Sequence, residues 1–239
     1  MGDALALELN NITLAQGDFT LTADLALTSA VTAIIGPSGG GKSTLLSAIA
    51  GFLAPQTGQV LWQGDNMTAT APGERPVSML FQDNNLFPHL TVMQNVGLGL
   101  RPNLRLSLED RMQVTTALDR VGLGGLAARK PAALSGGQQS RVALARVLVA
   151  DRPLVLLDEP FAALGPALKA DMLALVQDVL AEAGKQVVMV THDPQDAKSI
   201  AEMIVVVADG AALGPFETKA VFANPPEPLR AYLGTTGQS

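Results

Sequence analysis

Residues 30–50 read AVTAIIGPSGGGKSTLLSAIA, and the fold is predicted mainly from this segment. Its first part, Ala30 to Ile35, is almost continuously apolar and has the length of a buried strand. The glycines that follow let main-chain N–H groups approach an anion without a Cβ in the way, and a helix starting near Lys42 adds its positive dipole end. Gly51 then marks the end of a helix over residues 43–50. We predict a strand, a phosphate-binding loop and a helix.

The loop predicts a nucleotide-binding site because its full glycine–lysine–serine pattern stands between a buried strand and a helix. A chance glycine turn is the alternative. We expect Lys42 to reach the β- and γ-phosphates of the nucleotide and Ser43 to hold Mg²⁺. The predicted nucleotide-binding residues of this segment are Gly36, Pro37, Ser38, Gly39, Gly40, Gly41, Lys42, Ser43 and Thr44.

A second glycine-rich helix start follows later in the chain, at Leu134-Ser135-Gly136-Gly137-Gln138. One anion site can wrap one side of a triphosphate, so a second site reaches the same triphosphate only from outside. The pair of motifs therefore suggests that two chains close over shared ATP, with Ser135, Gly136, Gly137 and Gln138 as further nucleotide-binding residues.

Two carboxylates, Asp158 and Glu159, directly follow the apolar residues 154–157, which predict a buried strand. Asp158 is placed to hold the hydration shell of Mg²⁺. Glu159 points elsewhere, which suits a base that orients or deprotonates an attacking water. An exposed acidic turn before Pro160 is the alternative reading.

Two further polar side chains end predicted strands. His192 follows residues 187–190, where an imidazole can bond a γ-phosphate and the attacking water. Gln82 follows residues 77–81, and its amide is equally suited to ligating Mg²⁺, positioning water or capping a turn. We count both as candidate catalytic residues, and Gln82 also as a candidate metal ligand beside Ser43 and Asp158.

Composition excludes several classes of protein. The chain has 239 residues, 48% of them hydrophobic, a net charge of −6 and no cysteine. A core can therefore form, whereas disulfides, zinc thiolates and a cysteine nucleophile cannot. The acidic balance argues against nucleic acid as a partner. The apolar runs fall short of the roughly twenty residues that span a bilayer, and Met1 to Leu5 lacks the layout of a signal peptide.

The order of the predicted elements defines a fold class. Alternating residues between Ala4 and Ile35 predict antiparallel strands, and a helical stretch then interrupts a series of strands and helices. We predict an α/β fold, a P-loop NTPase (RecA-like) core with an N-terminal antiparallel β-subdomain and an inserted helical subdomain. The single domain would comprise a core of residues 1–82 and 151–239 and a helical subdomain of residues 83–150.

Taken together, the glycine loop, Gln82, the Ser135 motif, Asp158-Glu159 and His192 resemble the ATPase subunits of ABC transporters, in order and spacing and over nearly the whole chain. The resemblance implies binding of ATP and Mg²⁺, hydrolysis, and a head-to-tail dimer in which Ser135 and its neighbours contact the γ-phosphate held by the other copy. It also implies a transmembrane permease as partner, a periplasmic solute-binding protein as indirect partner, and a place on the cytoplasmic face of the inner (plasma) membrane.

Residues 75–87, 91–100 and 205–210 are similar to the ATPases of bacterial thiamine (thiamine pyrophosphate) importers. That similarity implies the energy-coupling subunit of such an importer. Residues 32–36 resemble molybdate importer ATPases instead, so an importer of molybdate or another small solute is the alternative.

Two departures from the family pattern favour a different alternative, a nucleotide-gated interaction module that hydrolyses ATP slowly. The family usually has an aspartate where this chain has Gly165, which puts tight coupling of two ATP sites in doubt. An aromatic residue that stacks on adenine is also missing near Ala15 to Gly17, and Phe19 is the nearest replacement. The complete set of catalytic residues argues for hydrolysis.

Overall fold

The computed structural model describes residues 7–236, so the predicted strand start at Ala4 and the stretch Met1 to Leu5 lie outside the described residues. Contacts divide the chain into two compact units: a terminal unit of residues 1–77 and 186–239, and a central unit of residues 78–185. These contact units do not test the predicted core of residues 1–82 and 151–239 or the predicted helical subdomain of residues 83–150, which stay a prediction. No helix within residues 7–236 is long and apolar enough to cross a membrane.

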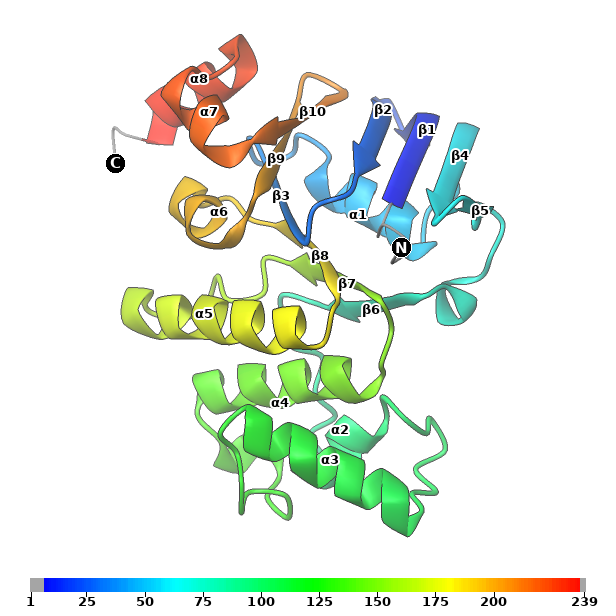
Figure 1. The fold of residues 1–239 in the computed structure, drawn as a ribbon, viewed down its shortest axis with the longest axis vertical. Coiled ribbons are helices and arrows are strands. Elements are labelled where there is room, and N and C mark those ends of the chain that lie inside the picture. Colours follow the sequence, from blue (N-terminus) through cyan, green and yellow to red (C-terminus); the bar gives the residue numbers. More distant parts are fainter. Residues whose placement is uncertain (1–6, 237–239) are drawn as a thin grey trace. The chain divides into compact units, whose positions relative to one another are not determined.

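The terminal unit is built on a mixed sheet (Figure 1). Its strands are β1 (Leu7–Gln16), β2 (Phe19–Leu27), β3 (Val31–Ile35), β4 (Thr57–Trp62), β5 (Asp65–Asn66), β8 (Gln186–Val190), β9 (Met203–Ala208) and β10 (Ala211–Glu217). They run in the order β5-β4-β1-β2-β10-β9-β3-β8. β1 pairs antiparallel with β2 and β4, whereas β3 pairs parallel with β8 and β9. The predicted antiparallel start and the buried parallel strands are confirmed.

Strand β10 was not predicted. It lies between β2, at the end of the antiparallel strands, and β9, which begins the parallel strands. It pairs antiparallel with β9 and, through Ala211 and Ala212, parallel with β2. Its sequence gives a weak signal because the register shifts between Leu213 and Phe216, around a Gly-Pro pair that interrupts the alternation of side chains. Only pairing with neighbours from distant parts of the chain makes this segment a strand.

Helices of the terminal unit follow its strands in the chain. They are α1 (Lys42–Ala50), α6 (Pro194–Ile200), α7 (Thr218–Ala223) and α8 (Glu227–Thr236). The predicted helix after the glycine loop is confirmed, and Gly51 ends it with a φ of 88° in the left-handed region. Helix α8 was not predicted, since the prolines near its start are typical of a loop.

Arg75 closes the C-terminal end of α1. Its buried guanidinium donates to the main-chain oxygens of Ala48 and Ile49 at 2.9 and 2.8 Å, and to those of Thr68 and Thr70 at 2.9 Å each. A positive charge at a helix C-terminus satisfies carbonyl groups that have no partner within the helix. Arg75 therefore anchors the helix that begins at the phosphate loop.

The central unit consists mainly of helices. Strands β6 (Val77–Leu80) and β7 (Leu154–Asp158) are neighbours, and the helices are α2 (Val92–Gly97), α3 (Leu108–Arg120), α4 (Gly136–Val149) and α5 (Pro166–Glu182). Helix α4 packs against α2, α3 and α5, and its apolar side chains are buried. The predicted helices over residues 108–121 and 167–183 are confirmed within two residues at each end.

Candidate functional site

The phosphate loop runs from the end of β3 to the start of α1 and needs glycine at specific positions. Gly36 lies against β9, where a Cβ would stand 2.0 Å from the oxygen of Val207. Gly41 precedes α1 with a φ of 101°. Gly36 has no space for a side chain, and Gly41 has a left-handed backbone that other residues rarely adopt, so both positions favour glycine. The result is a loop whose main chain approaches its neighbours more closely than a residue with a Cβ would allow.

Lys42 lies inside this loop. Its ammonium group donates to the main-chain oxygens of Gly36 and Pro37, each at 2.8 Å, and the residue is 6% exposed. Ser43 is exposed at the first turn of α1. A fixed positive charge beside main-chain N–H groups at a helix start is the donor set that a phosphate requires, and the hydroxyl of Ser43 is an oxygen ligand suited to Mg²⁺.

Phe19, the candidate for stacking on adenine, packs against the loop itself. A Cβ placed on Gly41 would stand 2.7 Å from the ring carbon Cζ of Phe19. The half-buried ring therefore packs against the last glycine of the phosphate loop.

His192 lies at the same sheet edge as the loop. Strands β3 and β8 are parallel neighbours with Ile34 opposite Val190, and Gly36 and His192 each follow two residues later. His192 is exposed. The structure thus brings these two predicted site residues of the terminal unit to the carboxyl ends of adjacent strands, where ligands bind in open α/β sheets.

The two carboxylates stand at the end of β7 in the central unit. Asp158 is the last residue of the strand, and Glu159 has a φ of 45°. A left-handed backbone is uncommon for a side chain of this type and is often found at active sites. The turn is closed by a hydrogen bond from the nitrogen of Ala162 to the oxygen of Glu159 at 3.3 Å. Glu159 thus stands in a tight turn directly after β7.

Ser135 is the N-cap of α4. Its hydroxyl accepts from the nitrogen of Gln138 at 3.3 Å, and the Gln138 side chain accepts from the nitrogen of Ser135 at 3.0 Å. Ser135 and Gly136 are exposed, whereas Gly137 is buried against Leu168 of α5. This capping box presents a helix N-terminus to solvent, which suits an anion that arrives from outside.

Gln82 is exposed in the loop after β6. Two left-handed residues follow it, Asn84 with a φ of 57° and Asn85 with a φ of 46°. Arg146 of α4 donates to both of their main-chain oxygens. Arg146 was missed in the sequence, where it is one of two arginines in the helix that follows Ser135.

The comparisons with known proteins identify the family of this chain. A model of the ABC transporter family matches residues 24–162, more than half of the chain. The chain belongs to the ABC transporter family. The matched range contains the phosphate loop, Gln82, the Ser135 motif and the pair Asp158-Glu159. This ABC transporter chain is thus an ATP-binding ATPase subunit, and the resemblance inferred from its motifs is confirmed.

Individual relatives cover nearly the whole ABC transporter chain. The thiamine import ATP-binding protein ThiQ of Cereibacter sphaeroides is 61% identical over 95% of this chain and 99% of its own length. The structure of cbiO1 from Clostridium perfringens, part of the ABC transporter complex cbiONQ, matches with a TM-score of 0.81 and 31% identity over 91% of this chain and 90% of that one. A dimeric structure of MJ0796, a bacterial ABC transporter cassette, matches with a TM-score of 0.74 and 32% identity over 89% and 98%. The predicted fold class is confirmed.

Proposed function

We propose that this ABC transporter subunit hydrolyses ATP to drive import of thiamine or thiamine pyrophosphate. The observation that carries the proposal is the 61% identity to a thiamine import ATP-binding protein over 95% of the chain. The similarity extends beyond the phosphate loop and includes the loop after Gln82, where the family meets its permease. A molybdate importer, the alternative, rests on the resemblance of residues 32–36.

Each predicted site residue has a role in this proposal. Lys42 and the main chain of residues 36–44 bind the phosphates of ATP, and Ser43, Asp158 and Gln82 hold Mg²⁺ through oxygen atoms. The metal ion, when bound, neutralises charge that develops on the β- and γ-phosphates. The geometry of the loop supports this assignment because it combines a buried lysine with glycines at the positions before the helix.

Hydrolysis requires a group that orients water and a group that contacts the γ-phosphate. Glu159 accepts a proton from the attacking water, and its left-handed backbone supports a functional assignment. His192 donates a hydrogen bond to the γ-phosphate and keeps the water in line. Both residues follow buried strands, so their main chains have a rigid support.

We also propose a head-to-tail dimer at the cytoplasmic face of the inner membrane. Ser135, Gly136, Gly137 and Gln138 of one copy contact the γ-phosphate bound to the other. The exposed capping box at the start of α4 and the match to a dimeric cassette support this assembly. A permease spans the membrane, and a periplasmic protein delivers the solute to it.

Glu159→Gln tests the catalytic part of the proposal. The amide cannot accept the proton, so we expect the hydrolysis rate of purified protein with Mg-ATP to fall by about a hundredfold or more. The variant also accumulates as an ATP-bound dimer, measured by light scattering. Glu202→Gln, which alters an exposed carboxylate between α6 and β9, is the matched control. A Glu159→Gln variant as fast as the parent rejects the base assignment.

The substrate is tested separately, with the subunit, its permease and its binding protein in proteoliposomes. Thiamine should raise ATP hydrolysis and enter the vesicles, whereas molybdate should do neither. Stimulation by molybdate alone would leave the ATPase assignment intact and overturn the substrate.

A further inference from the structure

The C-terminal helix reaches the main chain of His192. The hydroxyl of Tyr232, on α8, donates a hydrogen bond to the main-chain oxygen of His192. Tyr232 is 8% exposed, and Leu229, one turn earlier on the same helix, is fully buried. Helix α8 packs beside β9. The phenol group is therefore enclosed in the terminal unit, with its hydroxyl directed at the second residue after β8.

Residues on either side of His192 are held by local bonds. The Thr191 hydroxyl donates to Asp196 at 3.0 Å and accepts from the nitrogen of Asp193 at 3.0 Å. Asp193 in turn caps α6 by accepting from the nitrogen of Gln195 at 2.9 Å. All of these bonds join residues at most five positions apart, so they shape the start of α6.

The bond from Tyr232 differs because its partners are 40 residues apart. It fixes the direction of a carbonyl group, and with it the peptide plane between His192 and Asp193. A rotation of that plane changes ψ of His192 and so tilts the Cα–Cβ bond that carries its imidazole. The nitrogen of the same peptide unit donates to the Thr191 hydroxyl, so Tyr232 holds from a distant helix a plane that Thr191 holds locally.

We propose that Tyr232 is a positioning residue for His192, through which the C-terminal helix sets the reach of the imidazole toward the γ-phosphate and the attacking water. The proposal rests on the function proposed above, in which His192 contacts both. Misplacement of a reacting group by about 1 Å costs up to a hundredfold in rate. A single hydrogen bond at the main chain is thus sufficient to affect hydrolysis.

Tyr232→Phe removes the hydroxyl and keeps the ring that packs α8. We expect kcat for ATP hydrolysis by the full-length protein to fall by about tenfold, while KM and the affinity for a fluorescent ATP analogue stay within about twofold. Loss of positioning acts on the chemical step, whereas general damage to the fold lowers nucleotide binding as well.

A matched control is available in the same region. Thr218, at the start of α7, is 6% exposed and its hydroxyl donates to the main-chain oxygen of Ala201 at 2.7 Å. Thr218→Val removes the same kind of buried bond, from a hydroxyl to a carbonyl, at a residue outside the candidate site. It should lower the melting temperature as Tyr232→Phe does and leave kcat unchanged.

A double-mutant cycle with His192→Ala decides whether Tyr232 acts through the imidazole. In that background Tyr232→Phe should cause no further fall in kcat, because the group that it positions is gone. Equal tenfold losses in both backgrounds would show that Tyr232 acts elsewhere and overturn the proposal.

Two other results would also overturn it, and they are distinguishable. A Tyr232→Phe variant with full kcat, beside a slow His192→Ala variant, rejects the positioning role and leaves the proposed function intact. A His192→Ala variant with full kcat rejects the role of His192 in hydrolysis, and the positioning role with it.

Discussion

One terminal nitrogen of Arg146 lies 2.7 Å from the main-chain oxygen of Asn84, and the other lies 2.8 Å from that of Asn85. Asn84 also donates from its side chain to the hydroxyl of Ser140 at 3.3 Å. Burial lowers the pKa of Arg146 from the usual value of arginine. Helix α4, which begins at the Ser135 motif, is thus bonded at two points to the loop after Gln82.

Replacing Arg146 should release this loop. Arg146→Met leaves two carbonyls of left-handed residues without their charged donor, so we expect a loss of about 2 kcal/mol in the free energy of unfolding in urea. Protease cleavage after Phe81 or Phe87 should become faster. Arg111→Met, at an exposed position of α3, is the control and should stay within about 0.5 kcal/mol of the parent. Equal stability of the two variants would mean that the Arg146 bonds contribute nothing.

Gly36 should be irreplaceable for steric reasons. A Cβ at Gly36 would stand 2.0 Å from the oxygen of Val207, whereas a Cβ at Gly39 meets nothing within 4 Å, although both have a positive φ. Gly39→Ala should therefore cost only about 1 kcal/mol, for its left-handed backbone. Gly36→Ala should cost several times more in thermal unfolding, and a loss equal to that of Gly39→Ala would contradict the close approach of β9.

Gly165→Asp should be accepted by the fold. Gly165 directly precedes α5, its φ is not in the left-handed region, and a Cβ there meets nothing within 4 Å. An aspartate before a helix is a better cap than glycine, so the stability should rise by a few tenths of a kcal/mol. We also expect the Hill coefficient of ATP hydrolysis to increase. Ala163→Asp adds the same charge two residues earlier, and an equal effect of that variant would exclude a role specific to Gly165.

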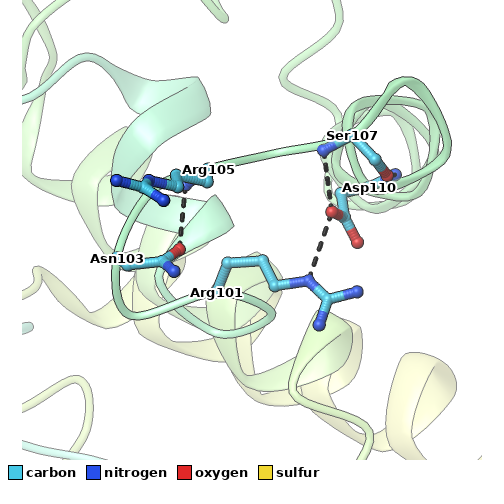
Figure 2. Close-up of polar contacts among 5 residues, drawn as sticks. All are labelled: Arg101, Asn103, Arg105, Ser107 and Asp110. Carbon is cyan, nitrogen blue, oxygen red and sulfur yellow. Dashed lines mark hydrogen bonds and ion pairs between the residues drawn. The ribbon is translucent and has the colours of Figure 1, made fainter.

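Asp110 should make the stability of the central unit depend on acid pH (Figure 2). Its carboxylate accepts from the nitrogen of Ser107 at 2.8 Å and from Arg101 at 3.3 Å. These contacts, the Ser107 main chain first, hold the pKa of Asp110 below its usual value. A lowered carboxyl pKa stabilises the folded state above the unfolded value of about 3.9, and that contribution is lost as the pH falls below it.

The test compares the parent with Asp110→Asn between neutral pH and pH 3. The parent should be more stable at neutral pH, and the difference in free energy of unfolding should shrink as the carboxylate of Asp110 is protonated. Glu109→Gln, at the neighbouring exposed position, should show no such trend. A difference that is constant with pH would show that the carboxylate charge is not responsible.

Local patterns predicted much of this molecule. The strand before Gly36, the helix after Lys42 and the helix over residues 108–121 were all confirmed, because each depends on neighbours in the sequence. Strand β10 and helix α8 were missed because distant residues hold them in place, as the pairing of Ala211 with Thr22 and the burial of Leu229 show. A segment with a weak local pattern forms a strand or a helix only where the rest of the fold supplies strands to pair with or side chains to pack against.

The glycine loop, the acidic pair and the Ser135 motif were enough to identify an ABC transporter ATPase, because the family is recognised by the types and spacing of these residues. Tertiary structure decided which other residues support these groups. Arg146 reaches the loop after Gln82, and Tyr232 reaches the carbonyl of His192 across 40 residues. Hydrogen bonds to main-chain atoms leave no mark in a sequence pattern, because every residue offers the same carbonyl group and only folding brings a donor to it.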